Sequence, residues 1–226
     1  MTLSNFGTIG TGFAGWPSLP SCQYPANSGV EHLFIGGLWV GGVIDEGGNR
    51  VTAVSTGAVD VSSVRDLSEG FEMRTTSPMR ERSSDIASLF FSPDAVSEQD
   101  FIADFTDANR RLPGRDPPQP IPNHVTPLNL AVHLESYAWS FPFADNFVIL
   151  RYTITNVPTK VIDSFRVGFW ADGVVRNTLF TPPGGSAFYA SGGNGFDTVE
   201  RNISWQFTTY HCQLQNGIRS EVGGVL

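Results

Sequence analysis

Two stretches of alternating apolar and polar side chains, residues 147–155 and 162–171, limit the fold of this chain more than any other feature of its sequence. Their apolar positions fall on every second residue: Val148, Leu150, Tyr152 and Ile154 in the first stretch, and Phe165, Val167 and Phe169 in the second. A period of two places such residues on one face of a β-strand, where they can be buried. Because turn-forming residues separate the two stretches, we expect them to form adjacent antiparallel strands.

The remainder of the chain also favours short strands over helices. It holds 24 glycines and 15 prolines. Its charged fraction of 16% lies below the roughly 25% of an average soluble domain, and exposed helix faces are usually rich in charge. Residues 33–44 predict a buried strand, which a turn at residues 45–49 joins to a second strand at residues 50–55. Residues 112–127 contain six prolines and predict a loop.

Weaker patterns predict further short strands at residues 71–75, 101–106, 187–189 and 203–210. Together with the stronger segments they predict an all-β fold. We expect an antiparallel β-sandwich of the jelly-roll or fibronectin/immunoglobulin-like type, with long Gly- and Pro-rich loops. The chain of 226 residues is long enough for one such domain, at residues 26–226. The residues before it, 1–25, are rich in glycine, proline and aromatic side chains and predict an extended N-terminal arm.

The charge balance limits the partners of this protein. The formal net charge is −8, whereas nucleic acids and anionic membranes attract basic surfaces. We therefore expect no nucleic-acid partner. No apolar run reaches the roughly 18 residues of a membrane span, so we also expect no membrane span.

No arrangement of residues points to catalysis. The GxSxG and HExxH motifs are missing from the sequence. His133 lies in the apolar segment at residues 131–134, where a histidine is more often structural than catalytic. Paired carboxylates could serve a glycosidase, but 22 Asp and Glu residues give no basis for choosing a pair. We expect no enzyme activity and keep a hydrolase of β-sandwich type as the last alternative.

Four aromatic residues, Tyr137, Trp139, Phe141 and Phe143, occupy alternate positions and would line one face of an extended chain. Rings in such a row commonly fill the space between two sheets, and we favour this interpretation. The alternative is a ligand site, in which Trp139 and Tyr137 stack against the sugar rings of a glycan.

Two acidic residues at the ends of predicted strands, Asp145 and Asp172, are candidate ligands of Ca²⁺, a cation that binds oxygen atoms. The competing interpretation is that each caps a turn through its own backbone. We expect no other cofactor.

Cys22 and Cys212, the two cysteines of the chain, lack the spacing of a zinc site. They would either form a disulfide that closes most of the chain or remain unpaired thiols.

Four motifs occur in order along the chain: GGLWVGG at residues 36–42, FSPDAVSEQDFIADFTD at 91–107, AVHLESYAWSFPFADNFVILRYTITN at 131–156 and VGFWADGVVRNT at 167–178. Through these motifs the chain resembles a group of uncharacterised secreted proteins of Bacteroidetes-like bacteria, many of them exported by the type IX secretion system. The resemblance implies export, an extracellular or cell-surface location and β-sandwich architecture, and it implies no reaction.

The chain departs from this group because it shows neither a signal peptide nor a C-terminal sorting domain. We therefore expect a mature or trimmed product, or part of a longer protein.

The leading hypothesis is thus a non-catalytic structural protein of the cell surface or extracellular space, which self-assembles through strand edges or binds other surface proteins. A single lysine, Lys160, supports this hypothesis, because lysines commonly protect strand edges from pairing. The alternative is a carbohydrate-binding module that recognises a glycan through an aromatic platform or with the help of Ca²⁺.

Overall fold

The computed structural model describes residues 1–12, 19–58, 70–112, 114–157, 160–177, 192–197, 203–208 and 223–225. The chain divides into two compact units. The larger unit contains residues 3–9 and 36–170, and the smaller unit contains residues 1–2, 10–35 and 171–226.

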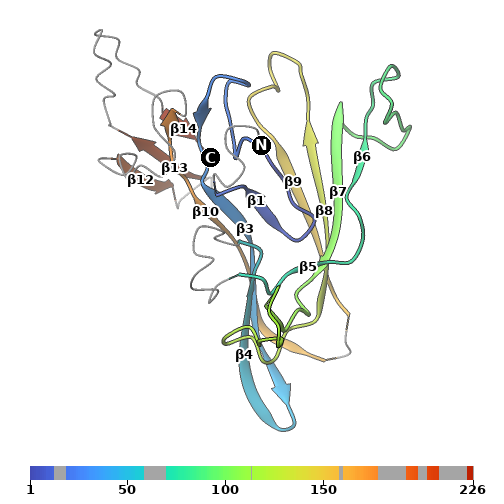
Figure 1. Cartoon of the computed structure of the whole chain (residues 1–226), viewed down its shortest axis with the longest axis vertical. Helices are drawn as coiled ribbons and strands as arrows, with labels where there is room; N and C mark the ends of the chain where they lie inside the picture. Colours follow the sequence, from blue (N-terminus) through green and yellow to red (C-terminus); the bar gives the residue numbers. More distant parts are fainter. Residues whose placement is uncertain are drawn as a thin grey trace. The chain divides into compact units, whose positions relative to one another are not determined.

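The larger unit contains most of two β-sheets (Figure 1). In the first, which we call sheet I, β3 lies between β10 on one side and β1 and β4 on the other. In the second, sheet II, the order is β5 and β6, then β7, β8 and β9. The strands of sheet I are β1 (Thr8–Gly10), β3 (Ile35–Glu46), β4 (Asn49–Thr56) and β10 (Ile162–Asp172). The strands of sheet II are β5 (Arg74–Thr75), β6 (Arg80–Arg82), β7 (Gln99–Thr106), β8 (Leu130–Ala138) and β9 (Ile149–Asn156).

Alternate residues of the two sheets meet in one apolar core. β3 contributes Leu38, Val40 and Ile44, while Phe105 of β7 and Leu134 of β8 come from sheet II. These side chains are almost completely buried, as expected where two sheets pack face to face. The described residues therefore form an all-β, sandwich-like structure without a helix, which confirms the predicted fold class at this level.

Several sequence predictions are confirmed in detail. β3 and β4 form the predicted hairpin, with Glu46 paired to Asn49 across the turn. Both residues at the tip of that turn, Gly47 and Gly48, have positive φ angles of 64° and 89°, a conformation that glycine adopts easily. The proline-rich segment is a loop between β7 and β8, and the weak prediction at residues 101–106 corresponds to β7. The strand expected at residues 187–189 lies outside the described residues.

The loop between β7 and β8 is tied down by a buried carboxylate. The backbone N–H of Leu130 donates to Asp107 Oδ1 at 2.6 Å, and the N–H of Leu128 donates to Oδ2 at 2.9 Å. The Ser55 hydroxyl of β4 also donates to Oδ2, at 3.0 Å. Asp107 therefore fixes the start of β8 against sheet I.

The predicted pairing of the two most regular strands is wrong. Both strands exist, as β9 and β10, but β9 pairs with β8 in sheet II and β10 pairs with β3 in sheet I. The two strands, although consecutive in the sequence, thus belong to different sheets. The apolar faces of both strands still point toward the space between the sheets, because a strand's alternation fixes its buried face and leaves its neighbour open.

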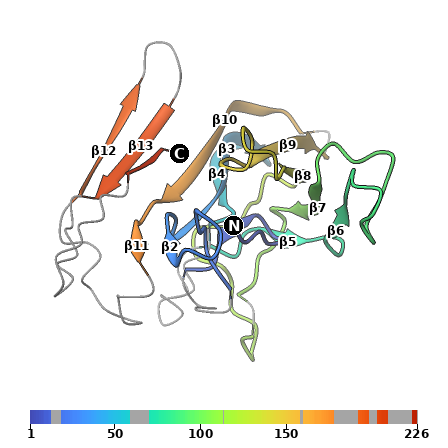
Figure 2. The same cartoon turned by 90° about the horizontal axis from the view of Figure 1, so that it is seen from above.

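The smaller unit holds two short sheets, one of two strands and one of three. Figure 2 shows β12 and β13 of the three-stranded sheet side by side. β2 (Val30–Glu31) pairs with β11 (Arg176–Asn177). β13 (Ile203–Thr208), which confirms the strand expected at residues 203–210, lies between β12 (Gly192–Asp197) and β14 (Gly223–Val225). Within the described residues no helix is long and apolar enough to cross a membrane.

Part of the expected N-terminal arm pairs with its own chain. β1 lies beside β3 in sheet I, and Ile9 in β1 is buried. The Thr8 hydroxyl donates to the carbonyl of Gly57 at 2.6 Å and anchors this strand. Residues 13–18 of the arm lie outside the described part of the chain.

Candidate functional site

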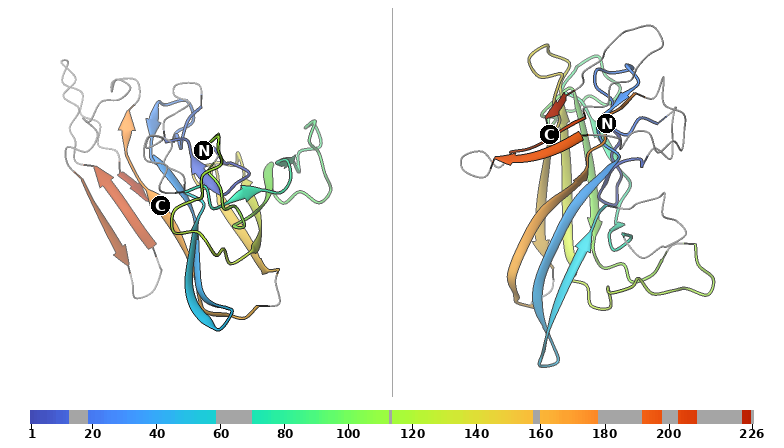
Figure 3. Two further views of the ribbon diagram at one scale, coloured as in Figure 1. Left: turned by 60° about the horizontal axis from the view of Figure 1, so that its bottom comes forward. Right: turned by 90° about the vertical axis from the view of Figure 1, so that its left-hand side faces the viewer.

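An apolar groove with a volume of about 620 Å³ opens between β9 and β10, which run next to each other in the larger unit (Figure 3, right). Leu150, Tyr152 and Ile154 of β9 form one wall. Phe165, Val167 and Phe169 of β10 form the other, and the buried Leu38 of β3 lies at the floor. The groove is therefore the part of the sandwich interior that remains open on this side.

The walls of the groove combine core residues with solvent exposure. Val167 is 55% exposed and Phe169 is 50% exposed, although both lie on the inward face of β10. Exposed apolar side chains that share one groove are candidates for contact with a partner.

Both strands that border the groove are edge strands among the described residues. β9 pairs only with β8, and β10 pairs only with β3. Each strand therefore has one edge whose backbone N–H and C=O groups are unpaired within the described sheets, and such an edge can accept a further strand.

Tyr152 brings a polar group to this apolar site. Its hydroxyl is buried and has no hydrogen-bond partner among the described residues, and burial raises the pKa of the phenol. The side chain stays neutral, and its hydroxyl lacks the partner that buried polar groups normally have.

The outer face of sheet II carries a charged network, built on Asp104, His133 and Glu135. His133 Nδ1 lies 2.6 Å from Asp104 Oδ1, and this hydrogen bond holds the pKa of the Asp104 carboxyl below its usual range. Glu135 lies between Arg82, at 3.3 Å, and Arg151, at 3.4 Å. The charges in the middle of sheet II are therefore paired within the chain.

The Asp104–His133 pair of this network lines a hollow of about 360 Å³, and the order of its groups differs from that of a catalytic triad. The Ser77 hydroxyl donates to Asp104 Oδ2 at 3.1 Å, so the carboxylate lies between the serine and His133. Nucleophilic catalysis needs the histidine between the acid and the nucleophile. His133 lies on the outer face of the sheet and is partly exposed, and its structural role stays a prediction.

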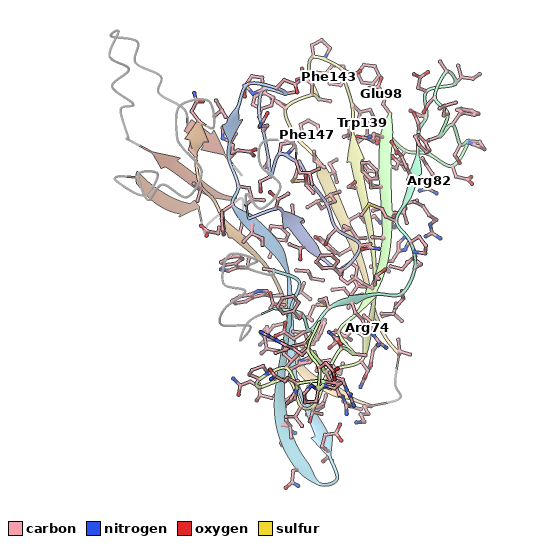
Figure 4. The ribbon with its side chains drawn as sticks, in the orientation of Figure 1. Arg74, Arg82, Glu98, Trp139, Phe143 and Phe147 are labelled. Carbon is pink, nitrogen blue, oxygen red and sulfur yellow. The ribbon has the colours of Figure 1, made fainter. Side chains whose placement is uncertain are left out.

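The predicted row of aromatic residues is divided between buried and exposed positions. β8 ends at Ala138, and the following chain turns, with the N–H of Ala144 bonded to the carbonyl of Phe141. Tyr137 is buried, but it lies on the outer face of sheet II with His133 and Glu135, outside the core between the sheets, and its ring lies 6.5 Å from that of Trp139. Phe141 and Phe143 stack on each other outside the core, with Phe143 80% exposed. Figure 4 shows Trp139, Phe143 and Phe147 at the same end of sheet II.

A second aromatic pair, which the sequence did not single out, lies on the outer face of sheet I. The rings of Trp39 in β3 and Trp170 in β10 are 6.3 Å apart and nearly parallel, with an interplanar angle of 4°. Trp39 is exposed. The space beside Gly168, two residues before Trp170 in β10, is also open, because a Cβ atom added there would contact no other atom. The two tryptophans are far apart in sequence, and only the pairing of β3 with β10 brings them together.

The candidate calcium ligands lie in different units. Asp145 is exposed in the β8–β9 loop, and its N–H donates to the carbonyl of Phe141 at 2.9 Å. Asp172 ends β10, and its carbonyl accepts from the N–H of Phe34 at 2.8 Å. Among the described residues, no cluster of three or more His, Cys, Asp or Glu side chains is arranged to hold a metal ion.

Cys22 is partly buried in the smaller unit, and burial raises the pKa of its thiol. The backbone N–H of Cys22 donates a hydrogen bond to Oε2 of the buried Glu31 carboxylate at 2.6 Å. The backbone N–H of Ser21 donates to Oε1 of the same carboxylate at 3.2 Å. Cys212 lies outside the described residues, so the disulfide between Cys22 and Cys212 stays a prediction.

Comparison with known proteins found no match to a family model, to a curated protein or to a solved structure. The functional interpretation therefore depends on the geometry of the described residues.

Proposed function

We propose that this protein is a non-catalytic structural protein that binds copies of itself, or another surface protein, by adding a strand at the β9–β10 groove. The observation that supports this function best is the apolar groove itself, with an edge strand on each side of it. An extended polypeptide matches both features. Its backbone pairs with a strand edge, and its alternate side chains enter the apolar groove.

The side chains along the two strands favour such an addition. Edge strands are usually protected by lysines, prolines or inward-pointing charges. β9 and β10 contain no lysine or proline, and their groove-facing residues are uncharged. Among the described residues, neither β9 nor β10 therefore carries the lysines, prolines or inward-pointing charges that usually protect a strand edge.

The location at the cell surface or outside the cell belongs to the same proposal. It draws on the resemblance to secreted proteins of Bacteroidetes-like bacteria, which the motifs at residues 36–42 and 131–156 carry. The finer assignment to a jelly-roll or fibronectin/immunoglobulin-like topology also remains a prediction.

The substitution Val167→Lys tests the groove. It places a charge on an exposed wall, where a bound strand would bury it without a partner. We expect self-association to weaken by at least about tenfold, because burying an unpaired charge costs more than the 1.4 kcal/mol of one decade in affinity. Sedimentation velocity over a range of concentrations measures the effect. Thr155→Lys on the opposite face of sheet II is the matched control, because it adds the same charge outside the groove.

Hydrogen exchange provides the second readout for this experiment. Strand addition should slow exchange of the β9 or β10 amides in the associated wild-type protein. Equal association of wild type and Val167→Lys, with no added protection in either strand, would overturn the proposal.

The Trp39–Trp170 pair favours glycan binding as a second candidate function. The parallel rings of the exposed Trp39 and the partly buried Trp170 provide a surface on which the apolar face of a sugar ring can stack. A glycan array read with and without EDTA tests this function together with its proposed dependence on Ca²⁺. Binding that Trp39→Ala abolishes and Trp139→Ala preserves would place the site on sheet I. The reverse pattern would place it on the residues first selected from the sequence.

A further inference from the structure

One end of sheet II presents apolar side chains to solvent on two loops. The β6–β7 loop, residues 83–98, and the β8–β9 loop, residues 139–148, meet at this end, where Gln99 pairs with Ala138. Leu89 is 99% exposed and Ile86 is 83% exposed in the first loop, and Phe143 projects from the second. Further exposed residues at this end are Phe90, Phe91, Val96, Phe141, Phe147 and Val148.

Hydrogen bonds hold the first of these loops in place. The N–H of Ser83 donates to the carbonyl of Phe90, and the N–H of Ser92 donates back to the carbonyl of Ser83, both at 2.9 Å. The buried Asp100 accepts from the N–H groups of Val96 and Ser97, each at 2.8 Å. The loop is thus ordered while its apolar tip remains in water, an arrangement that favours binding over core packing.

The same two loops are acidic. They contain the carboxylates of Asp85, Asp94, Glu98 and Asp145 and no lysine or arginine. None of the four carboxylates belongs to an ion pair among the described residues. We call residues 83–98 and 139–148 the acidic end of sheet II.

The opposite end of sheet II, where Thr106 pairs with Ala131, has the complementary chemistry. Arg110, Arg111 and Arg115 are exposed in the β7–β8 loop, Arg74 is exposed in β5, and none of them has an acidic partner among the described residues. Asp116 is the exposed acid in the described part of this loop. The loop also exposes Val125 and the prolines 117, 118, 120 and 122. We call Arg74 and residues 107–129 the arginine end.

This separation of charge contrasts with the middle of the sheet. There Arg80, Arg82 and Arg151 all pair with carboxylates of the same chain, at distances of 3.0–3.7 Å. Among the described residues of sheet II and its loops, unpaired carboxylates therefore gather at the acidic end and unpaired guanidinium groups gather at the arginine end. Figure 4 labels residues of both ends, with Glu98 and Phe143 at one and Arg74 toward the other.

We propose that the acidic end of one copy binds the arginine end of a second copy. Guanidinium groups pair with carboxylates and stack on aromatic rings, and proline-rich segments bind to exposed aromatic surfaces. Each chain carries both halves of this contact. Because the two halves lie at opposite ends of one sheet, the contact is head-to-tail. Its repetition gives a ring if the rotation between copies closes, and an open chain if it does not.

The end-to-end contact is independent of the β9–β10 groove and uses none of its residues. An experiment that overturns one of the two proposals therefore leaves the other standing. To keep them apart, every measurement below is made on the full chain with Val167→Lys, which disables the groove.

Two variants in this background test the contact. The first combines Leu89→Lys with Phe143→Lys and blocks the acidic end. The second combines Arg111→Glu with Arg115→Glu and blocks the arginine end. All four side chains are exposed, so the fold should persist, and circular dichroism with a thermal melt checks this. A matched control, Thr153→Lys, adds charge at an exposed position in the middle of sheet II, where Thr153 pairs with His133.

Sedimentation velocity is expected to show concentration-dependent oligomers for the parent and for the control, and at least about tenfold weaker association for each blocked variant alone. A 1:1 mixture of the two blocked variants should form a dimer and nothing larger, because each supplies the end that the other lacks. Added salt should dissociate the oligomers by screening the charges.

A parent that stays monomeric at its highest soluble concentration would overturn the proposal. So would blocked variants that associate as strongly as the parent, or a mixture that remains monomeric. If the acidic end instead retains a basic proline-rich peptide or a glycan while the parent stays monomeric, the partner is a different molecule and the second-copy proposal is overturned.

Discussion

The two sides of the sandwich carry the same sequence pattern but have different environments. On the β7–β8 side, alternate residues such as Phe105 and Leu134 are almost fully buried. On the β9–β10 side, the alternation is at least as regular, yet Val167 and Phe169 remain about half exposed. The difference arises because β7 and β8 have neighbours on both edges, whereas β9 and β10 each have one among the described strands. Alternation therefore identifies the apolar face of a strand without showing whether that face is covered.

The largest expected effect separates these two sides directly. Phe105→Ala removes a core ring that is 1% exposed and should lower the free energy of unfolding by about 3–5 kcal/mol. Phe169→Ala removes the same ring from the groove wall and should cost roughly 1 kcal/mol, because much of that ring is already in water. Urea denaturation of the two variants measures both values. Equal losses would mean that the groove is filled in the free protein.

The buried carboxylate of Asp107, on the β7–β8 side of the sandwich, provides the next test. Asp107→Ala removes the acceptor of three hydrogen bonds and should cost about 3 kcal/mol, because the N–H groups of Leu128 and Leu130 lose their partner. Asp116→Ala in the same loop is exposed and should change stability by less than about 0.5 kcal/mol. Chemical denaturation gives both numbers, and a small effect at Asp107 would show that the loop is not anchored there.

Removing the Tyr152 hydroxyl, on the β9–β10 side of the sandwich, should raise the free energy of unfolding, whereas Phe105→Ala and Asp107→Ala should lower it. Tyr152→Phe keeps the ring and deletes a buried polar group that has no hydrogen-bond partner among the described residues. We expect unfolding to cost about 1 kcal/mol more in the variant, seen as a higher urea midpoint with an unchanged slope. A lower midpoint would reveal that the hydroxyl has a partner in the native protein.

The smallest effect concerns acid stability on the outer face of sheet II. The hydrogen bond from His133 lowers the folded-state pKa of Asp104, so this carboxylate stabilises the fold above its unfolded pKa of about 4. That contribution is lost as the pH falls through the lower, folded-state value. Asp104 is partly exposed, so we expect less than about 1 kcal/mol. Asp104→Asn should flatten the stability curve between about pH 5 and 2, and an unchanged curve would contradict the role of this pair.

Parts of the candidate sites were readable from the sequence, and others were not. The alternation at residues 148–154 marked Leu150, Tyr152 and Ile154, which line one wall of the groove. The aromatic row at residues 137–143 predicted rings on one face of an extended strand, whereas Phe141 and Phe143 lie in a loop. The exposure of that loop was not expected, because the chain turns after Ala138 where the pattern still fits an extended strand. Trp39 and Trp170 gave no local signal, since each lies in an ordinary strand.

The sequence by itself determined the local structure of the larger unit. Its glycines and acids defined the β3–β4 turn, its prolines defined the β7–β8 loop, and its alternating residues defined the inner faces of β9 and β10. These features depend on φ/ψ preferences and on side-chain order within a few residues, which every local segment carries with it.

Only the tertiary structure decided which strands became neighbours. β9 and β10 looked like partners because the residues between them predicted a turn, but β9 pairs with β8 in sheet II and β10 pairs with β3 in sheet I. Strand pairing depends on backbone hydrogen bonds that any sequence can offer, so the choice of partner follows from packing of the whole core. That choice opened the groove, stacked Trp39 on Trp170 and set the acidic loops and the arginines at opposite ends of one sheet.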